Sequence, residues 1–427
     1  MPIIDHNKYF CIGCGGCAFK CPKQCISMTV DNLGQFSPDI DRDACIECKL
    51  CEKICPLYNT ENIDYGFNYN SIVGNYISCY MGFDDAFRVT SASGGFVTGV
   101  LNTLLSQNVI DYAVCLRNKK NENRFYQYEF INKSENLIHC SRSAYYPMEM
   151  SQMLRHIKEN NGKYAIVVLP CQAKVIRSIQ KKDPVLRQRI VFLLGLVCGG
   201  MPGAAMVEYL AESVGSNQSY IAQITFREKN GVDLNRNYGI TLRNNEGATF
   251  RSTFRNGAFG FSFLNKLFHY RGCNICDDIF AEYADAVFMD AWIPEYNSEK
   301  MGRSICIIRN EELLKVVKSY FSDNPNCREV TIDVPIDAQN SVGLIQRKKK
   351  LAYFKRRFYK RFNYIVPECG EQTYSISEKV KFFIRSFQEF VIQNKSSSDW
   401  NKYKAGKIVF SKYDSNIHKF VKRIKRI

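Results

Sequence analysis

The chain has 427 residues, of which 45% are hydrophobic and 13% aromatic. This composition is typical of a globular protein and excludes an intrinsically disordered one, and the length predicts two or three domains. The net charge of +16 at pH 7 lies at one end of the chain. Residues 346–427 hold 22 of the 58 Lys and Arg and 6 of the 42 Asp and Glu, so residues 1–345 carry 36 of each and no net charge.

The start of the chain and its cysteines indicate a compartment. The sequence passes from Met-Pro-Ile-Ile-Asp into a cysteine motif, without the charged and then apolar leader of a secreted protein. Its longest apolar stretch, residues 190–200, is well short of the roughly 20 residues that a membrane-spanning helix needs. The 19 cysteines favour metal ligation in a reducing compartment over disulfides. We therefore expect a soluble, cytoplasmic protein.

Two cysteine runs of the same form, C-x-x-C-x-x-C-x-x-x-C-P, mark residues 1–60 as one domain. This is the ligand pattern of a two-cluster bacterial ferredoxin, in which three cysteines of each run hold one [4Fe-4S] cubane and the fourth binds the other cubane. We therefore predict that cluster one is bound by Cys11, Cys14, Cys17 and Cys55, and cluster two by Cys45, Cys48, Cys51 and Cys21. A zinc or disulfide cluster is the weaker alternative, because zinc sites use two ligand pairs, not two equal quartets. Cys25 lies outside the pattern and is expected to be a small buried residue.

After a polar linker, Asn59 to about Asn75, strands and helices alternate through a second domain at residues 76–340. Apolar strands are predicted at 76–83, 109–116, 162–169, 190–197, 286–290 and 304–308. Helices are predicted at 95–107, 151–160, 173–180, 204–214, 259–270 and 311–321. This alternation predicts an α/β domain whose sheet is largely parallel and covered on both faces. Strands at 221–228, 238–243 and 248–252 look antiparallel, so the domain is expected to contain a mixed sheet.

Four motifs lie along this domain. Ser91-Ala-Ser93-Gly94-Gly95 stands between a strand and a helix, and Leu169-Pro-Cys171-Gln172 and Gly195-Leu-Val-Cys198-Gly-Gly each end a strand. Cys273-Asn-Ile-Cys276 comes shortly before Asp285-Ala-Val-Phe-Met-Asp290. In this order, and behind a double ferredoxin module, the motifs resemble the beta subunit of coenzyme F420-reducing hydrogenase and its dehydrogenase relatives. The resemblance covers roughly residues 5–310.

The resemblance implies a flavoprotein in which FAD and iron–sulfur clusters pass electrons between a two-electron donor and one-electron carriers. Coenzyme F420 or another two-electron carrier is the co-substrate that it suggests. It also implies cofactor binding by Gln172 and Asp290, although Met289 stands where relatives have a glycine. Some bacterial relatives are associated with cell-surface polysaccharide synthesis, so the family does not fix the substrate.

The segment from Ser91 to Gly95 is a candidate phosphate cradle. The hydroxyls of Ser91 and Ser93, with Gly94 and Gly95 at a helix N-terminus, offer backbone N–H donors and the positive end of the helix dipole. The alternative is an ordinary Ser-Gly helix start. Because the segment matches a family motif, the resemblance favours a flavin phosphate.

Four further cysteines, Cys171, Cys198, Cys273 and Cys276, are a candidate site for a third [4Fe-4S] cluster. The first two follow the carboxyl ends of strands, where open α/β sheets place their ligands. The other two form a pair with a two-residue gap that can chelate an iron centre. The alternative is that they are ordinary buried cysteines. The background cysteines of this kind are Cys79, Cys115, Cys140, Cys306, Cys327 and Cys369.

Other polar residues of the domain are less specific. Ser141-Arg142-Ser-Ala-Tyr145 resembles a Ser-Lys-Tyr segment of the family, and arginine keeps the cation for a phosphate but changes its geometry. Arg227-Glu-Lys229 could face the cofactor or the substrate, or could be a solvated end of a strand. We assign no catalytic residue.

The basic segment 346–427 is predicted to form a tail of amphipathic helices around 347–362, 379–391 and 417–427. These helices could pack on the body, or they could dock on an acidic protein partner or on the inner membrane surface. No nucleic-acid-binding motif accompanies the charge, so nucleic acid is not an expected partner.

These features predict an iron–sulfur flavoprotein oxidoreductase. Electrons would pass between a ferredoxin-like or reduced-coenzyme donor and a substrate through the clusters and FAD. The first alternative is an electron-transfer subunit of a larger complex, with no organic substrate of its own. The second is a protein whose clusters serve only to stabilise its fold.

Overall fold

The computed structural model describes residues 8–58, 68–120, 124–230, 234–367 and 373–426. Most of the predicted linker, residues 59–67, and Cys369 lie outside the described residues. None of the described helices combines the length and the apolar composition of a membrane-spanning segment.

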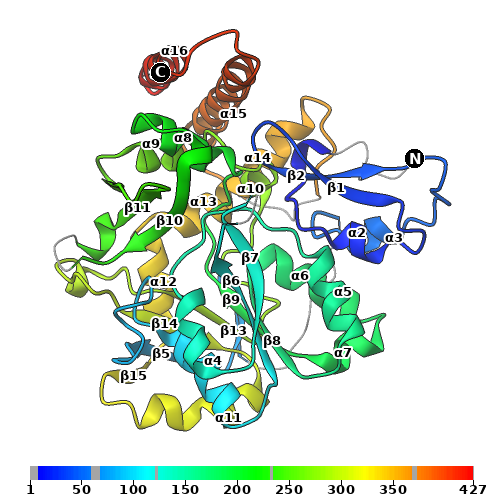
Figure 1. The fold of residues 1–427 in the computed structure, drawn as a ribbon, viewed down its shortest axis with the longest axis vertical. Helices are drawn as coiled ribbons and strands as arrows, with labels where there is room; N and C mark the ends of the chain where they lie inside the picture. Colours follow the sequence, from blue (N-terminus) through cyan, green and yellow to red (C-terminus); the bar gives the residue numbers. More distant parts are fainter. Residues whose placement is uncertain (1–7, 59–67, 121–123, 231–233, 368–372, 427) are drawn as a thin grey trace.

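Residues 8–58 form a small module at one side of the molecule (Figure 1). An antiparallel hairpin joins β1 (Ile26–Val30) to β2 (Phe36–Ile40). The short helices α2 (Gly16–Lys20) and α3 (Leu50–Lys53) each carry a cysteine of one run. The core of the module has few aliphatic side chains and is rich in cysteine; its buried members are Ala18, Cys25, Ile26, Ile40 and Cys51.

An eight-stranded sheet lies at the centre of the body in the order β15-β5-β14-β13-β9-β8-β6-β7. Its strands are β5 (Ser78–Gly82), β6 (Tyr112–Asn118), β7 (Tyr126–Ile131), β8 (Tyr164–Val168), β9 (Ile190–Leu196), β13 (Ala286–Asp290), β14 (Ser304–Ile308) and β15 (Cys327–Val330). Only β13, β9, β8 and β6 pair in parallel, and their outer neighbours are antiparallel. The sheet is mixed, as predicted, but the expectation of a largely parallel sheet is wrong.

Helices cover both faces of this sheet. Successive residues of β8 point to opposite faces, so that Ala165 lies in one core and Ile166 in the other. Helices α4 (Phe96–Ser106) and α11 (Glu311–Ser322) pack on the first face. The helices on the second face are α5 (Ser151–Glu159), α6 (Pro170–Gln180) and α7 (Pro184–Arg189).

A second, three-stranded antiparallel sheet is formed by β10 (Ile221–Glu228), β11 (Gly239–Asn244) and β12 (Thr249–Thr253). These are the segments predicted to be antiparallel. Helices α8 (Ala205–Ser213) and α9 (Ala258–Leu264) share a core with this sheet. Helix α9 ends at Leu264 and not near Tyr270, because a turn and a short bridge at His269 follow it.

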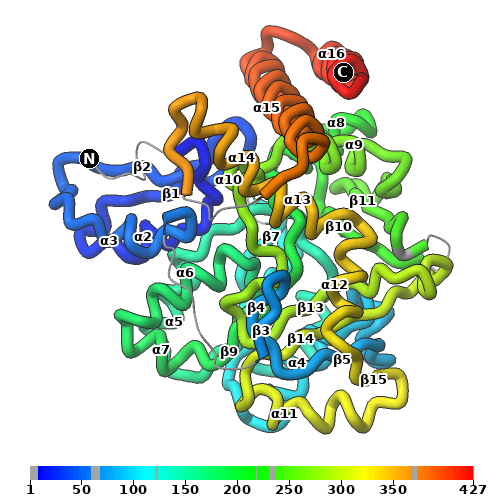
Figure 2. The backbone as a smooth tube through the Cα atoms, turned by 180° about the vertical axis from the view of Figure 1, so that it is seen from behind, coloured from blue at the N-terminus to red at the C-terminus, as the bar shows by residue number. Residues whose placement is uncertain are grey.

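The C-terminal segment is helical, as predicted, and much of it is packed on the body. Its helices are α12 (Asp333–Asn340), α13 (Leu344–Lys348), α14 (Lys350–Lys360), α15 (Ile376–Lys404) and α16 (Phe410–Ile424). Figure 2 shows them leading from the large sheet past α10 (Gly272–Ile275) to the far end of the molecule. Trp400 and Tyr413 are fully buried in the core of the second sheet.

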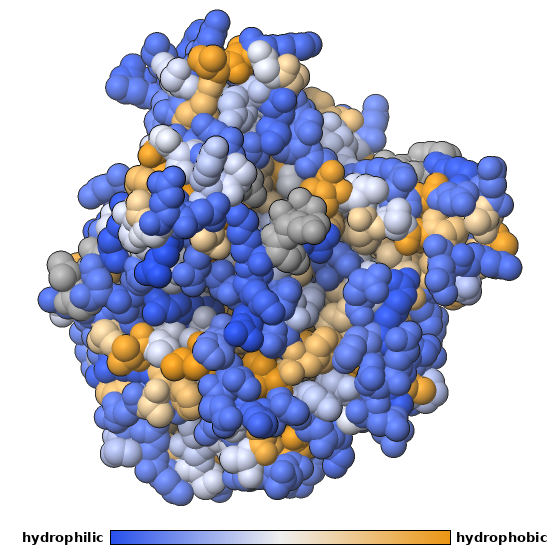
Figure 3. Space-filling view, in the orientation of Figure 1, coloured by the Kyte–Doolittle hydropathy of each residue, from blue (hydrophilic) through white to orange (hydrophobic). Residues whose placement is uncertain are grey.

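The basic charge of this segment is not all on the surface. Lys348, Lys355 and Arg356 are buried, with exposed fractions of 4%, 2% and 8%. These three residues therefore pack on the body, which is the first of the alternatives expected for the basic segment. In Figure 3, hydrophilic residues cover most of the face shown in Figure 1, and hydrophobic side chains gather in separate patches.

Candidate functional site

The structure groups the cysteines of the N-terminal module into two sets. The thiol of Cys17 has Cys14, Cys11 and Cys55 as its electrostatic neighbours, so the last cysteine of the second run faces the first run. Cys21 conversely lines a small hollow with Cys45, Cys48 and Cys51. These are the two quartets expected for the cubanes. The thiol of Cys25 is buried and lies 3.3 Å from that of Cys21, at the edge of the second quartet.

Burial controls the ionisation of the thiols in the first set, Cys11, Cys14, Cys17 and Cys55. It raises the pKa of Cys14 to about 12 and that of Cys17 well above its ordinary value. Thiols in such a place remain protonated unless a metal displaces the proton. The left-handed backbone of Gly13, at φ 66°, brings its N–H within 3.3 Å of the Cys11 sulfur. A donor set of four buried thiols with backbone N–H groups nearby fits an iron–sulfur cubane.

One large cavity, of about 1070 Å³, lies between the module, the large sheet and the second sheet. It opens where the strands β8 and β9 end, which is the place for ligands in an open α/β sheet. Gly94 is the one predicted cofactor residue that does not line it. The predicted residues that do are Cys14, Ser91, Ser93, Gly95, Cys171, Gln172, Cys198, Cys273, Cys276 and Asp290.

The four cysteines proposed for a third cluster converge on one wall of this cavity. Cys171 is in the first turn of α6, Cys198 follows β9, and Cys273 and Cys276 flank the turn of α10. The thiol of Cys171 has Cys276, Cys198 and Cys273 as its strongest electrostatic neighbours, followed by Cys14 of the N-terminal module. Burial raises the pKa of Cys171 well above its ordinary value and that of Cys273 to about 11.

The groups around these thiols suit a cluster. The Met201 N–H donates to the Cys273 sulfur at 3.4 Å. Among the described residues, no three His, Cys, Asp or Glu side chains are close enough together to hold a single metal ion. A cubane differs from a single ion in that each of its four thiolates binds a separate iron atom.

The predicted phosphate cradle is tied to the edge of the large sheet. Gly95, at φ 92°, precedes the first residue of α4. The Ser93 hydroxyl donates to the Arg303 carbonyl at 2.6 Å, and the Gly94 N–H donates to the Ser304 hydroxyl at 2.9 Å. Ser91 differs, because its buried hydroxyl oxygen has no hydrogen-bond partner among the described residues. A ligand oxygen in the cavity would satisfy it.

Arg142 is a second unsatisfied group on the cavity wall. Its Nη1 is buried without a hydrogen-bond partner among the described residues, and its backbone has a φ of 83°. Positive φ is uncommon for a residue with a side chain and costs energy. The neighbouring Ser141 hydroxyl donates to the Thr90 carbonyl at 2.8 Å, which brings this segment beside the cradle. Ser91 and Arg142 therefore offer a hydroxyl and a cation to an anionic group.

The other two predicted cofactor-binding residues, Asp290 and Gln172, already form hydrogen bonds within the protein. Asp290 accepts two hydrogen bonds of 2.6 Å from Arg227, and the Arg227 guanidinium also lies over the rings of Tyr238 and Trp292. The Gln172 amide oxygen accepts from the Leu169 N–H at 2.9 Å and so caps α6. Asp290 and Gln172 thus shape the cavity wall through bonds to the protein itself.

Sequence reasoning missed several cations of the cavity. Arg236, Arg243 and Arg255 come from the second sheet and its loops, and Arg347 and Lys348 come from α13. No local motif marks them, because each is brought to the cavity by packing between distant segments. On the side of the cavity formed by the second sheet, the sequence had indicated only the Arg227–Lys229 segment as a possible contact of the cofactor or the substrate.

Comparisons with known proteins identify the parts of the chain. Residues 81–155 match the N-terminal part, and residues 161–325 the C-terminal part, of the coenzyme F420 hydrogenase/dehydrogenase beta subunit. Residues 10–59 match a 4Fe-4S dicluster domain. The resemblance inferred from the motifs is thereby confirmed.

Individual relatives are more distant. One subunit of the F420H2 dehydrogenase of Methanosarcina mazei is 25% identical over 203 residues, which are 46% of this chain and 54% of the relative. The chain thus spans about half the length of this relative. A ferredoxin of Methanocaldococcus jannaschii is 41% identical over 54 residues, 13% of this chain and 66% of the ferredoxin. A chain of the F420-reducing [NiFe] hydrogenase complex of Methanosarcina barkeri shares the fold, with a TM-score of 0.51, 13% identity and coverage of 68% of this chain and 96% of that one.

Proposed function

Because the chain belongs to the family of coenzyme F420 hydrogenase/dehydrogenase beta subunits, we propose that it is the iron–sulfur electron-transfer subunit of a hydrogenase- or dehydrogenase-type complex. The observation that carries this proposal is the continuity of the thiol sites. Cys14 of the first quartet lines the same cavity as Cys171, Cys198, Cys273 and Cys276. Electrons entering at the N-terminal module would thus meet a third site on the wall of the cavity.

The four cysteines of the cavity wall would hold the third [4Fe-4S] cluster. We expect about twelve irons per chain in the anaerobically purified protein, and about eight in a variant with Cys273→Ala and Cys276→Ala. Removing both members of the pair leaves only Cys171 and Cys198, which cannot retain a cubane. Iron and sulfide analysis measures the difference. Cys327→Ala, which changes a cysteine of β15, should keep the full content. About eight irons in the unaltered protein would refute the third cluster.

We propose FAD as a second cofactor, held in the cavity. A flavin accepts electrons one or two at a time and so joins one-electron clusters to a two-electron carrier such as coenzyme F420. The unsatisfied Ser91 hydroxyl and Arg142 guanidinium would bind its phosphates. The cavity volume of about 1070 Å³ is large enough for a ligand of this size. If it binds FAD, the protein is an oxidoreductase with its own organic substrate. Without FAD it would only relay electrons between other proteins, which we call the relay function.

The flavin proposal predicts a specific loss of cofactor. Arg142→Gln should reduce the flavin released per chain at least fivefold, because the variant loses the buried cation that would face the phosphates. Released flavin is identified and quantified by chromatography after anaerobic purification. Arg361→Gln, a change at an exposed arginine, should leave the flavin content unchanged. Absence of flavin from the unaltered protein would favour the relay function. An equal flavin content in Arg142→Gln and Arg361→Gln would mean that groups other than Arg142 bind the phosphates.

The partner and substrate also remain proposals. A redox partner protein, such as a ferredoxin or the rest of a complex, would exchange electrons with the N-terminal module. For docking on a partner or at the inner membrane surface, α15 offers an exposed apolar stripe at helical spacing, formed by Ile376, Val380, Phe383 and Phe387. A cytoplasmic location and a role in polysaccharide synthesis stay predictions of the sequence alone.

A further inference from the structure

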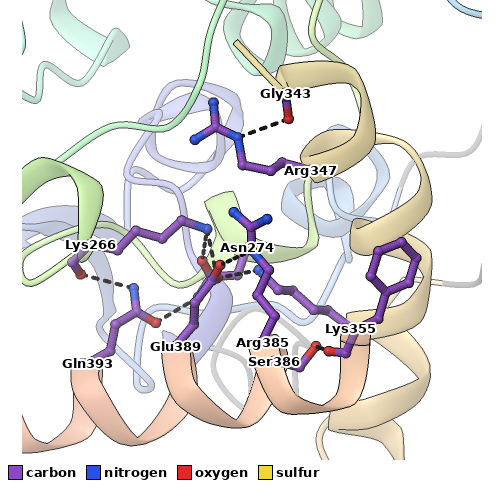
Figure 4. Close-up of polar contacts among 10 residues, drawn as sticks. Lys266, Asn274, Gly343, Arg347, Lys355, Arg385, Ser386, Glu389 and Gln393 are labelled. Atoms are coloured by element: carbon purple, nitrogen blue, oxygen red, sulfur yellow. Dashed lines mark hydrogen bonds and ion pairs between the residues drawn. The ribbon is translucent and has the colours of Figure 1, made fainter. Parts of the chain in front are cut away.

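The C-terminal helices complete the wall of the four-cysteine site. The short turn of α10, which separates Cys273 from Cys276, is held by residues from α14 and α15. The Arg356 Nε donates to the Ile275 carbonyl at 2.9 Å. The Asn274 amide donates to the Gln393 side chain at 2.7 Å (Figure 4). These partners lie beyond residue 325, where the family match ends.

Lys348, the last residue of α13, brings a positive charge to the same wall. Its side chain is 4% exposed. It lines the cavity wall together with Cys198, Cys273 and Cys276, and these three thiols are the strongest electrostatic neighbours of its ammonium group. Gly343, with a φ of 64°, is the N-cap of α13, and Lys348 lies at the other end of this short helix on the cavity wall.

Neighbouring lysines of this segment have a different environment. Lys349 forms an ion pair with Glu282 at 2.6 Å, and Lys355 pairs with Glu389. These two cations are thus neutralised by carboxylates, as buried cations usually are. The groups that act most strongly on Lys348 are instead three thiols of the proposed cluster site. A buried cation whose strongest neighbours are thiols is costly unless the thiols become anionic.

Iron binding would supply this negative charge. Four thiolates around a cubane leave a net anionic centre, and reduction of the cluster by one electron makes it more negative. A nearby cation and a hydrogen bond to a ligand sulfur stabilise the reduced state more than the oxidised state, because the reduced state has the larger negative charge. Both effects raise the reduction potential.

We propose that Lys348 is a positioning residue for the third cluster, which fixes the Cys276 ligand and raises the reduction potential of that cluster. The inference rests on the proposed third cluster. It gives the C-terminal segment, which lies outside the family match, a role in tuning the electron path. An electron would then reside preferentially on the third cluster, which lies on the cavity wall, and not on the clusters of the N-terminal module.

The test compares Lys348→Met with Lys348→Arg and with the unaltered protein in anaerobic redox titrations followed by electron paramagnetic resonance. Lys348→Met should retain about twelve irons and lower the midpoint potential of the third cluster alone. Lys348→Arg should restore most of the shift, because it keeps the charge. Lys381→Met removes an exposed charge of α15 as a control for net charge and should change nothing.

The outcomes separate this inference from the proposed function. A third cluster with the same potential in Lys348→Met and in the unaltered protein would overturn the role of Lys348 but leave the cluster in place. About eight irons in the unaltered protein would overturn both. If Lys348→Met loses the cluster, Lys348→Gln, which keeps a hydrogen-bond donor without the charge, is titrated instead. An unchanged potential in that variant would likewise overturn the inference.

Discussion

Replacing Cys48 with alanine is expected to remove about four irons per chain and to unfold most of the hairpin and the second cysteine run. Cys48 is in the second quartet, with Cys21, Cys45 and Cys51. The buried cluster at the centre of this module has two aliphatic side chains larger than alanine, Ile26 and Ile40, and otherwise consists largely of cysteines, while Ile54 packs in the core of the large sheet instead. Such a small core is too weak to order the module by itself, so most of its folding free energy must come from iron binding.

Amide hydrogen exchange followed by mass spectrometry can measure this effect region by region. In Cys48→Ala, protection should be lost over β1, β2 and α3. The body should keep its protection, because its core is formed by the large sheet and its helices. The loop around Cys14 should also stay ordered, since its carbonyl accepts from the Met150 N–H at 2.9 Å.

Cys25→Ala is the matched control for this experiment. Cys25 is as buried as Cys51, with 8% exposure each, and lies in the same core, but it is outside the repeated pattern. Its replacement should keep the iron and the exchange protection. Cys21 is a less suitable site for the ligand variant, because the Cys25 sulfur is 3.3 Å away and could replace it as a ligand. Loss of iron from Cys25→Ala equal to that from Cys48→Ala would contradict the predicted ligand assignment.

The parts of the fold that the sequence predicted well are those with a local signal. Strands β10, β13 and β14 have the bounds expected from their apolar patterns. The two cysteine runs are equally local, since their spacing alone determines how a loop can wrap a cubane. The motif order then led to the family, and the family match confirmed it.

The sequence failed where a structure depends on distant partners. Strand β7 has partly buried side chains along most of its length, and β15 is a short, half-exposed edge strand, so neither has a continuous apolar run. Both pair antiparallel with strands of the central sheet, as β14 does with β13 and β5, so the sheet is less parallel than expected. These two outer strands form because each pairs with a neighbouring strand of the central sheet, not because their own residues strongly favour a strand.

In the candidate site, too, some residues could be predicted from a local pattern and others depend on partners that are distant in the sequence. Cys171 and Cys198 could be placed together from their positions after strands, because neighbouring parallel strands end at the same edge. Arg227 and Asp290 form their ion pair between the two sheets, and neither pattern nor spacing relates them. Charge counting likewise predicted a basic tail, but it could not show that Lys348 and Lys355 enter the body.

Glu389 is the residue whose loss should destabilise the C-terminal helices most. Its carboxylate accepts from Lys266 at 2.8 Å, from Lys355, and from Arg385 at 3.2 Å (Figure 4). Lys266 also donates to Asn274 at 3.1 Å, so the same network holds the turn between Cys273 and Cys276. Glu389 therefore joins α15 both to α14 and to the wall of the four-cysteine site.

Glu389→Ala is expected to lower the free energy of unfolding by about 3–5 kcal/mol, because it leaves buried cations without their counterion. Lys355 has an exposed fraction of only 2% and so cannot recover its hydration. Chemical denaturation of the anaerobic protein near neutral pH measures the change. Glu378→Ala is the control, since Glu378 is a partly exposed residue at the start of the same helix and pairs with the exposed Lys350. Its effect on the free energy of unfolding should be much smaller than that of Glu389→Ala.

The pH dependence of this stabilisation has a definite sign. Burial tends to raise the pKa of the Glu389 carboxyl, but the Lys266 and Lys355 ammonium groups overcome it and hold the pKa well below its usual range. A glutamate in the unfolded chain has a pKa of about 4.3. A carboxyl whose pKa is lower in the folded state stabilises the fold fully above the unfolded value and loses this contribution as the pH falls through the folded value. The carboxylate itself should therefore add no pH dependence to the difference between the unaltered protein and Glu389→Ala from about pH 8 to pH 5. Any slope in this range is expected from Lys355, because burial lowers the pKa of its ammonium group to about 7. A difference that disappears within this range would mean that the buried carboxyl is protonated and that the network is not held by its charge.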